Sequence, residues 1–146
     1  MKTNDELLSM SPKELTDWLN VQFNIELPVS LETIDQMKEA GKLLSKTINI
    51  YSYLMSMASY AKISVREKKR ASDKCAKALK QNKDNELEEN LTIMANKAKI
   101  DYEDMVDRKE AIENAADIAN KQYQAISRMI TVKKEVNNEL QMLGEI

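Results

Sequence analysis

The chain has 146 residues, a net charge of −2, no histidine, one cysteine, two glycines and two prolines. Without histidine it lacks the commonest general base and the commonest transition-metal ligand, and one cysteine excludes an internal disulfide framework. Two glycines cannot form a glycine-rich phosphate loop, and a charge near zero argues against binding of polyanions by bulk electrostatics. We therefore expect a protein that is not an enzyme and that holds no metal and no cofactor.

The composition predicts an all-α fold. Aromatic residues make up 5% and charged residues 32% of the chain, and Gly or Pro is rare after Pro28. Such a sequence favours long amphipathic helices. We see neither an apolar run of membrane-spanning length nor the apolar segment of a signal peptide. We therefore expect a soluble protein with no membrane partner, located in the cytoplasm.

Residues 1–29 are expected to form a short N-terminal helical segment and a linker. This region holds the only tryptophan, the only phenylalanine and both prolines of the chain. Ser11 and Glu14 have the spacing of a capping box, with Pro12 at the first helical position, so a short helix is predicted to begin there. Pro28 disfavours helical angles at the residue before it, which predicts an extended linker.

Residues 30–146 are predicted to form a long antiparallel helical hairpin that resembles a coiled coil. Ser30 is a suitable N-cap, and the apolar residues after it keep the alternating three- and four-residue spacing of a seam, the line along which two helices meet. The next stop is the polar cluster at residues 82–86, where Asp84 or Asn85 is expected to cap the second helix. The predicted seam of the first helix contains Ile34, Met37, Gly41, Leu44, Ile48, Tyr51, Met55, Ala58 and Val65.

The second helix is predicted from about Glu86 to Met142, with Gly144 where a helix C-terminus would end. Its seam consists of two seven-residue series offset by four. The first series is Ala98, Met105, Ile112, Ala119, Ile126 and Leu140, and the second is Tyr102, Ala116, Tyr123 and Ile130. Because alanine is frequent there, two helices alone bury a narrow apolar stripe. We therefore expect other copies of the chain, or a partner protein, to cover the hairpin, and we favour a homo-oligomer.

A cluster of basic residues precedes the predicted tip. Residues 62–83 contain nine Lys or Arg and two acidic residues, a local charge of +7. On a helix, six of the basic residues fall within roughly a 100° arc and form a stripe about 25 Å long. Such a stripe suits the phosphate backbone of a nucleic acid. The members of this basic stripe are Lys62, Arg66, Lys69, Arg70, Lys77 and Lys80.

The sequence leaves two interpretations of the basic stripe open. The opposing segment, residues 86–107, has a charge of −5, so the two helices would neutralise each other along their flanks. Against this, the stripe is centred roughly 120° from the seam, too far for all six side chains to reach the neighbouring helix. Tyr53 and Tyr60 precede the stripe, and their rings would either stack on unpaired bases or pack in an oligomeric seam.

The order of these features resembles the UvsY family of phage recombination mediators, over roughly residues 44–142. The resemblance is one of order and spacing rather than of a tight motif. The residues that carry it are Ile50, Tyr51 and Ser52, then the end of the basic run at Lys77, Ala78, Leu79 and Lys80, and, after the polar break, Ala98, Tyr123, Ala125 and Ile126.

The resemblance implies a small, almost wholly helical protein that assembles into rings and binds single-stranded DNA. It also implies that the protein helps to load a recombinase where a single-strand-binding protein already sits, so both of these are implied partners. In that family a basic pair near the end of the first long helix contacts DNA. Lys77 matches the first member of that pair, whereas Leu79 occupies the second position, with Lys80 adjacent to it.

Two classes of function follow. The first is a non-enzymatic, oligomeric accessory protein of a phage recombination system that binds single-stranded DNA through the basic stripe. The second is a protein–protein interaction module, such as a phage inhibitor of a host nuclease or defence protein, or a helical assembly scaffold. In this second class the acidic faces around residues 86–89 and 101–117 would mimic nucleic acid or cover a basic groove.

Overall fold

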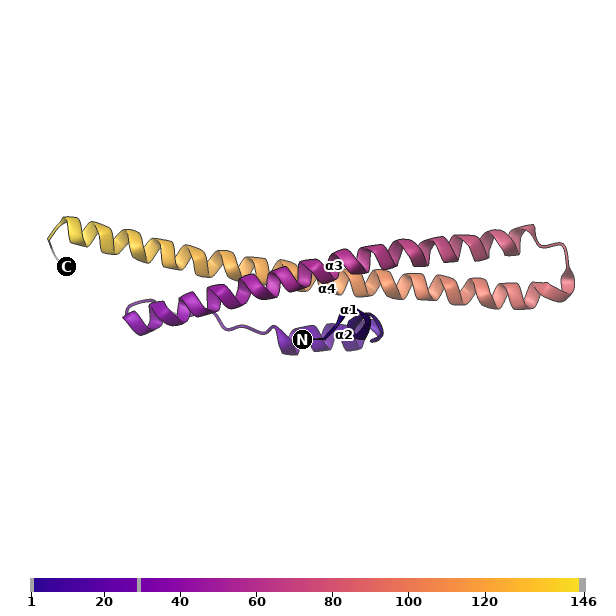
Figure 1. The fold of residues 1–146 in the computed structure, drawn as a ribbon, viewed down its shortest axis with the longest axis horizontal. Helices are drawn as coiled ribbons and strands as arrows, with labels where there is room; N and C mark the ends of the chain where they lie inside the picture. Colours follow the sequence, from indigo (N-terminus) through magenta and orange to yellow (C-terminus); the bar gives the residue numbers. More distant parts are fainter. Residues whose placement is uncertain (1, 29, 145–146) are drawn as a thin grey trace.

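The computed structural model describes residues 2–28 and 30–144. It consists of a long helical hairpin with two short helices packed against its middle (Figure 1). The helices are α1 (Asn4–Leu8), α2 (Pro12–Gln22), α3 (Ile34–Gln81) and α4 (Asn85–Met142). The described residues contain no strand, so the predicted all-α hairpin with a short N-terminal helical segment is confirmed.

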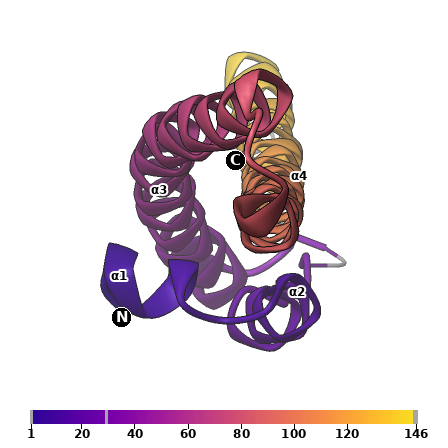
Figure 2. The ribbon, with the colours of Figure 1, turned by 90° about the vertical axis from the view of Figure 1, so that its right-hand side faces the viewer.

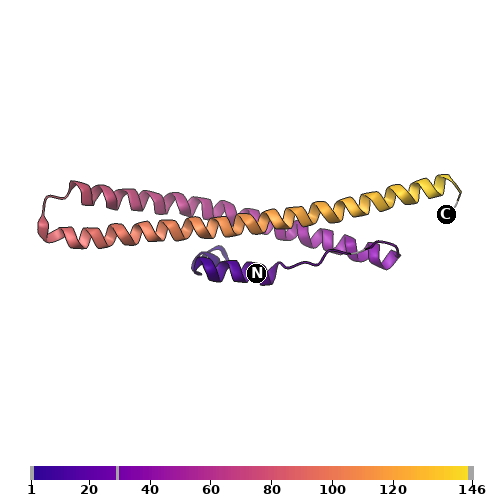
Figure 3. The same cartoon turned by 180° about the vertical axis from the view of Figure 1, so that it is seen from behind.

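The hairpin consists of α3 and α4, which run antiparallel and are joined by residues 82–84. The Asp84 carboxylate accepts the backbone N–H of Glu86 at 2.9 Å. Asp84 is therefore the N-cap of α4, at the predicted tip. Because α4 has 58 residues and α3 has 48, the C-terminal end of α4 extends beyond the start of α3 (Figure 3, yellow).

The start of α2 confirms the predicted capping box. The Ser11 hydroxyl accepts the backbone N–H of Glu14 at 3.1 Å, and the Glu14 carboxylate accepts the backbone N–H of Ser11 at 3.4 Å. Pro12 occupies the first helical position, where its missing N–H leaves no hydrogen bond unmade.

The first long helix begins three residues later than predicted. Its N-cap is Thr33 rather than Ser30, and the Thr33 hydroxyl accepts the backbone N–H of Gln36 at 3.1 Å. The side-chain carbonyl of Gln36 accepts the backbone N–H groups of Glu32 and Thr33 at 2.8 and 3.0 Å. These bonds satisfy backbone donors outside the helix, so the chain stays extended up to Thr33 and the prediction of Ser30 was wrong.

The main core lies where the N-terminal segment meets the hairpin. Figure 2 shows α1 beside α3, and α2 beside α4. Four residues of the segment are buried there, namely Leu7, Leu15, Leu19 and Ile25. They pack with buried residues of α3 and α4: Ile50, Leu54, Met57, Ala58, Ala61, Ile112, Ala116 and Ala119. The chain's own first 28 residues therefore supply part of the apolar cover that the two long helices lack.

The seam of α4 has the predicted phase, whereas that of α3 has it in only one of its two predicted series, the one that contains buried Ala58. The buried residues of α4 are Met105, Ile112, Ala116, Ala119 and Ile126, and all belong to the predicted series. In α3, the buried seven-residue series is Ala40, Thr47, Leu54 and Ala61. One of the two series predicted for α3 lies one position further along and faces solvent, with Ile34, Ile48 and Met55 exposed by 76%, 42% and 44%.

The phase of α3 is set by packing against the N-terminal segment and α4 together. Tyr53 and Tyr60 on one side of α3 contact the N-terminal segment through their hydroxyls. Ile50, Leu54 and Met57 lie between that side and α4 and are buried in the shared core. The predicted series from Ile34 to Met55 lies on the opposite side of the helix, where its large side chains remain exposed.

Over the described residues, none of the four helices combines the length and the apolarity that a bilayer span requires.

Candidate nucleic-acid interface

The basic stripe lies on the half of the hairpin that includes the tip. We call residues 62–104 the distal half, and residues 34–61 with 105–142 the proximal half. Not one residue of the distal half, all of which the structure describes, is buried. The side of α3 that faces α4 is marked by partly buried Val65, Ser72 and Leu79. The distal half is thus a thin two-helix rod.

All six residues of the basic stripe are exposed. They lie on α3, which runs as one uninterrupted helix through this region. By helical geometry their centre is roughly 120° round the helix from Val65, Ser72 and Leu79. The stripe therefore points away from α4 and runs along the outer side of the rod for about 25 Å. Its side chains, Lys62, Arg66, Lys69, Arg70, Lys77 and Lys80, share this face with one carboxylate, that of Asp73.

No ion pair joins α3 to α4 in the part of the chain that the structure describes. The ion pairs found there are Lys2–Glu6 at 4.0 Å, Lys42–Glu39 at 3.2 Å and Lys109–Glu113 at 3.5 Å. Each joins residues three or four positions apart, and none involves the basic stripe. The structure thus places the stripe out of direct contact with the acidic segment 86–107, and the six cationic groups are accessible to an anionic ligand.

The two tyrosines that precede the stripe both contact the N-terminal segment. The Tyr53 hydroxyl donates to the Lys2 carbonyl at 2.7 Å, and its ring lies 6.0 Å from that of Phe23, centroid to centroid. Burial raises the pKa of Tyr53. The Tyr60 hydroxyl donates to the Asp5 carboxylate at 3.0 Å, and this hydrogen bond raises the pKa of Tyr60. Tyr53 therefore packs at the core, while Tyr60 remains 37% exposed at the proximal end of the stripe.

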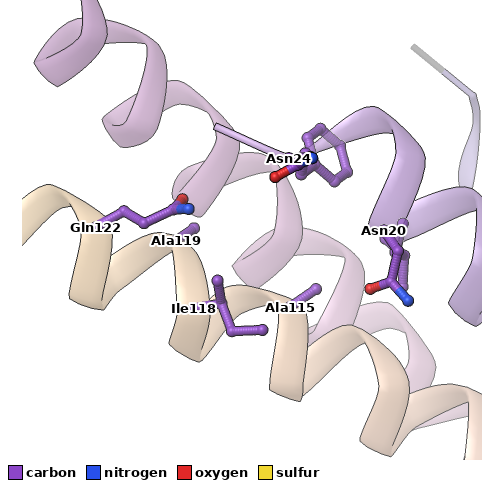
Figure 4. A pocket seen from close by; sticks show the side chains of 8 residues that line it. Asn20, Asn24, Ala115, Ile118, Ala119 and Gln122 are labelled. Atoms are coloured by element: carbon purple, nitrogen blue, oxygen red, sulfur yellow. The ribbon is translucent and has the colours of Figure 1, made fainter. Parts of the chain in front are cut away.

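A hollow of about 340 Å³ lies between α2 and α4, beside the place where they pack together (Figure 4). It is bordered by side-chain amides and by small or apolar side chains, none of which is titratable or nucleophilic. One of the amides, that of Gln122, donates to the Ile25 carbonyl at 3.2 Å and fixes the linker on α4. The lining consists of Leu19, Asn20, Phe23, Asn24, Ala115, Ile118, Ala119 and Gln122. This lining offers packing and amide hydrogen bonds rather than acid–base or nucleophilic chemistry.

Among the described residues, no cluster of three or more His, Cys, Asp or Glu side chains is arranged to hold a metal ion. The single cysteine, Cys75, is partly buried between the two helices of the distal half. Comparison with known proteins identifies no relative: no family model, no curated protein and no solved structure matches the chain.

Sequence reasoning missed the contact that holds the N-terminal segment on α4. The Nε of Arg108 donates to the Met10 carbonyl at 2.7 Å. In the sequence, Arg108 was simply one charge among many on a polar helix. Its partner is a backbone carbonyl 98 positions away, and no local pattern identifies such an acceptor.

Proposed function

We propose that this protein is a non-enzymatic, oligomeric accessory protein that binds single-stranded DNA through the basic stripe of α3. The recombination role, with a recombinase or a single-strand-binding protein as partner, follows from the resemblance to the UvsY family. The observation that carries the proposal is the exposure of six basic side chains on one face of a rigid helix, with no carboxylate of α4 paired to them. A row of this kind gains binding free energy by releasing the counterions condensed on a phosphate backbone.

Single-stranded rather than duplex DNA is favoured by the shape of the surface. The distal half is a straight two-helix rod and presents no short recognition helix that would enter a groove. A flexible single strand can follow the row of cations, and Tyr60 at its proximal end offers a ring face for stacking. Several stripes in one oligomer would raise the apparent affinity by holding one strand at more than one point.

The salt dependence of binding tests this proposal. We expect a fluorescently labelled oligothymidylate of about 16 nucleotides to bind at low salt, as measured by fluorescence anisotropy. If all six cations contact phosphates, the plot of log Kobs against log salt concentration should have a slope of about −4 for a single strand. Absence of binding at low salt would rule the proposal out.

A matched pair of triple variants locates the interface. Reversal of three stripe charges should abolish binding or make the salt slope shallower by about 2, the value expected for three lost phosphate contacts. The changes are Arg66→Glu, Arg70→Glu and Lys77→Glu. The control makes the same total charge change at exposed lysines outside the stripe, which are Lys38→Glu, Lys46→Glu and Lys121→Glu. The control should retain most of the affinity, since these positions lie more than a Debye length from the stripe. An equal loss of affinity in both variants would show that the oligonucleotide is attracted by the total charge of the protein and not by the stripe.

The same pair of variants distinguishes DNA binding from the alternative function, a protein–protein interaction module. If the acidic faces of α4 bind a protein partner, reversal of the stripe charges leaves that interaction intact. A stripe variant that loses DNA binding and the cellular function together would support the DNA-binding proposal. Loss of DNA binding with the cellular function retained would contradict it.

A further inference from the structure

The C-terminal end of α4 has an apolar stripe that the rest of the chain covers only at its start. Three of its members, Val132, Val136 and Leu143, are 52%, 42% and 72% exposed, and the other two are partly buried. On a helix all five fall within an arc of roughly 80°. This C-terminal stripe consists of Met129, Val132, Val136, Leu140 and Leu143. Its C-terminal part lies on the end of α4 that extends beyond the start of α3 (Figure 3), whereas Met129 packs on the buried cluster of Leu31, Ala40 and Ile126.

The C-terminal stripe continues a face of α4 that is already an interface within the chain. Further towards the tip, Ala115 and Gln122 lie on this face and border α2. Met129 and Val136 follow Gln122 in the same seven-residue series, so they belong to the same side of the helix. The linker that follows α2 also covers this face, as far as Leu31, which lies beside Met129 and Val132. Beyond that point the face remains apolar, but no described segment of the chain packs on it.

The spacing of the stripe is symmetric about Val136. Its members are separated by three, four, four and three positions, so the stripe has the same pattern when it is followed in either direction. A twofold axis through Val136 therefore brings the stripe onto itself in an antiparallel pair, which is the condition for an isologous interface. In such a pair Val132 lies level with Leu140 of the second copy, and Met129 lies level with Leu143 of the second copy.

We propose that a second copy of this chain covers the C-terminal stripe, with the two α4 helices antiparallel about a twofold axis at Val136. A hollow of about 460 Å³ beside the stripe fits this arrangement. It is lined mainly by apolar groups of Leu31, Met129, Val132 and Val136. Because Leu143 of the second copy lies level with Met129, its side chain enters this hollow and becomes buried.

This interface is independent of the DNA-binding proposal, since it lies at the opposite end of the hairpin from the basic stripe. A twofold pair closes at two copies, so the interface makes a dimer and not an open chain. The two tips point away from each other. From the helical rise, the centres of the two basic stripes are about 120 Å apart, so one dimer holds a nucleic acid strand at two separated points.

A charge at the axis tests the dimer. Val136→Asp places two carboxylates against each other in the interface, and we expect the dimer dissociation constant to rise about a hundredfold. The measurement is sedimentation equilibrium, together with light scattering. Val21→Asp is the matched control, because Val21 is also an exposed helical valine near the end of its helix. The control should remain dimeric. A wild-type monomer, or an unchanged dissociation constant in Val136→Asp, would overturn the proposal.

Cysteine cross-linking tests the register. In a Cys75→Ser background, Val136→Cys brings two thiols together at the axis, and we expect mild oxidation to give a disulfide-linked dimer. Val132→Cys, one turn away, should not cross-link to itself, because its neighbour is Leu140 of the second copy. A mixture of Val132→Cys and Leu140→Cys chains should cross-link. Equal self-cross-linking of Val132→Cys and Val136→Cys would overturn the proposed register.

The two proposals can fail separately. The Val136→Asp monomer keeps its basic stripe, so it should still bind the short oligothymidylate while losing the dimer mass. If wild type and Val136→Asp are both monomers that bind the oligonucleotide, the interface is wrong and the DNA-binding proposal stands. If the wild-type protein is a dimer but binds no oligonucleotide, the DNA-binding proposal is wrong and the proposed interface stands.

Discussion

The proximal and distal halves of the hairpin use the same two helices in opposite ways. Every buried residue of α3 and α4 lies in the proximal half, where α1, α2 and the linker complete the core. The distal half contains none among its described residues, yet it holds the basic stripe. The comparison indicates that buried apolar contacts are concentrated in one half and that accessible positive charge is displayed on the other. Changes to the stripe should therefore cost little stability.

The largest effect that separates the two halves should come from core leucines. Leu54 is fully buried in the proximal half, so Leu54→Ala should lower the free energy of unfolding by about 2–5 kcal/mol, through lost burial and the cavity left behind. Leu91→Ala makes the same change at a partly exposed position of the distal half and should cost clearly less. Urea denaturation followed by circular dichroism measures both. Equal costs would contradict the division of the hairpin into two unlike halves.

A smaller effect should come from the contact between the N-terminal segment and α4. Arg108→Ala removes the charged donor of the partly buried Met10 carbonyl, and we expect a loss of about 1.5–3 kcal/mol in the same denaturation experiment. Arg70→Ala, at an exposed position of the distal half, should change the stability by no more than about 0.5 kcal/mol. A neutral Arg108→Ala variant would show that the core forms without this tether.

The smallest effect concerns the hydroxyl of Tyr53. Tyr53→Phe should cost about 0.5–1.5 kcal/mol at neutral pH, since it removes the hydrogen bond to the Lys2 carbonyl. Burial, and then the Glu6 carboxylate, raise the pKa of Tyr53 in the folded protein. As the pH rises above the ordinary tyrosine value of about 10, the unfolded chain ionises first, so the free energy of unfolding falls.

Denaturation between about pH 9 and about pH 11 measures this dependence. Wild-type protein should lose stability steadily over that range, and Tyr53→Phe should lose less. Tyr60, whose pKa is also raised, contributes to the decline in both proteins. Identical pH profiles for wild type and Tyr53→Phe would show that the Tyr53 phenol has the same pKa in the folded and unfolded states.

Local signals in the sequence determined the helices and most of the positions where they begin and end. The capping box at Ser11 and the cap at Asp84 act through hydrogen bonds to residues two or three positions away, so the pattern of neighbours is sufficient to predict them. The scarcity of Gly and Pro left no other break in the two long helices. The start of α3 was misplaced because Thr33 and Ser30 are both capable caps, and the Gln36 side chain decides between them.

The candidate basic stripe was also readable from the sequence, because position on an exposed helix follows directly from spacing. The absence of ion pairs between the stripe and α4 could not be predicted from the sequence, because it depends on where the acidic side chains of α4 lie. The C-terminal stripe could have been found from its regular spacing. Without the structure, however, no pattern tells that α2 and the linker stop covering this face of α4 at Leu31.

Only the tertiary structure decided which face of α3 is buried. Two neighbouring seven-residue series of α3 are apolar enough to form a seam, and the one that includes Ile48 and Met55 faces solvent. Periodicity predicts that the helix has an apolar face, but the elements that pack on the helix determine which residues form that face. Here Leu7, Leu15 and Ile25 of the N-terminal segment settle that choice, because burial gains free energy only where several elements exclude water together.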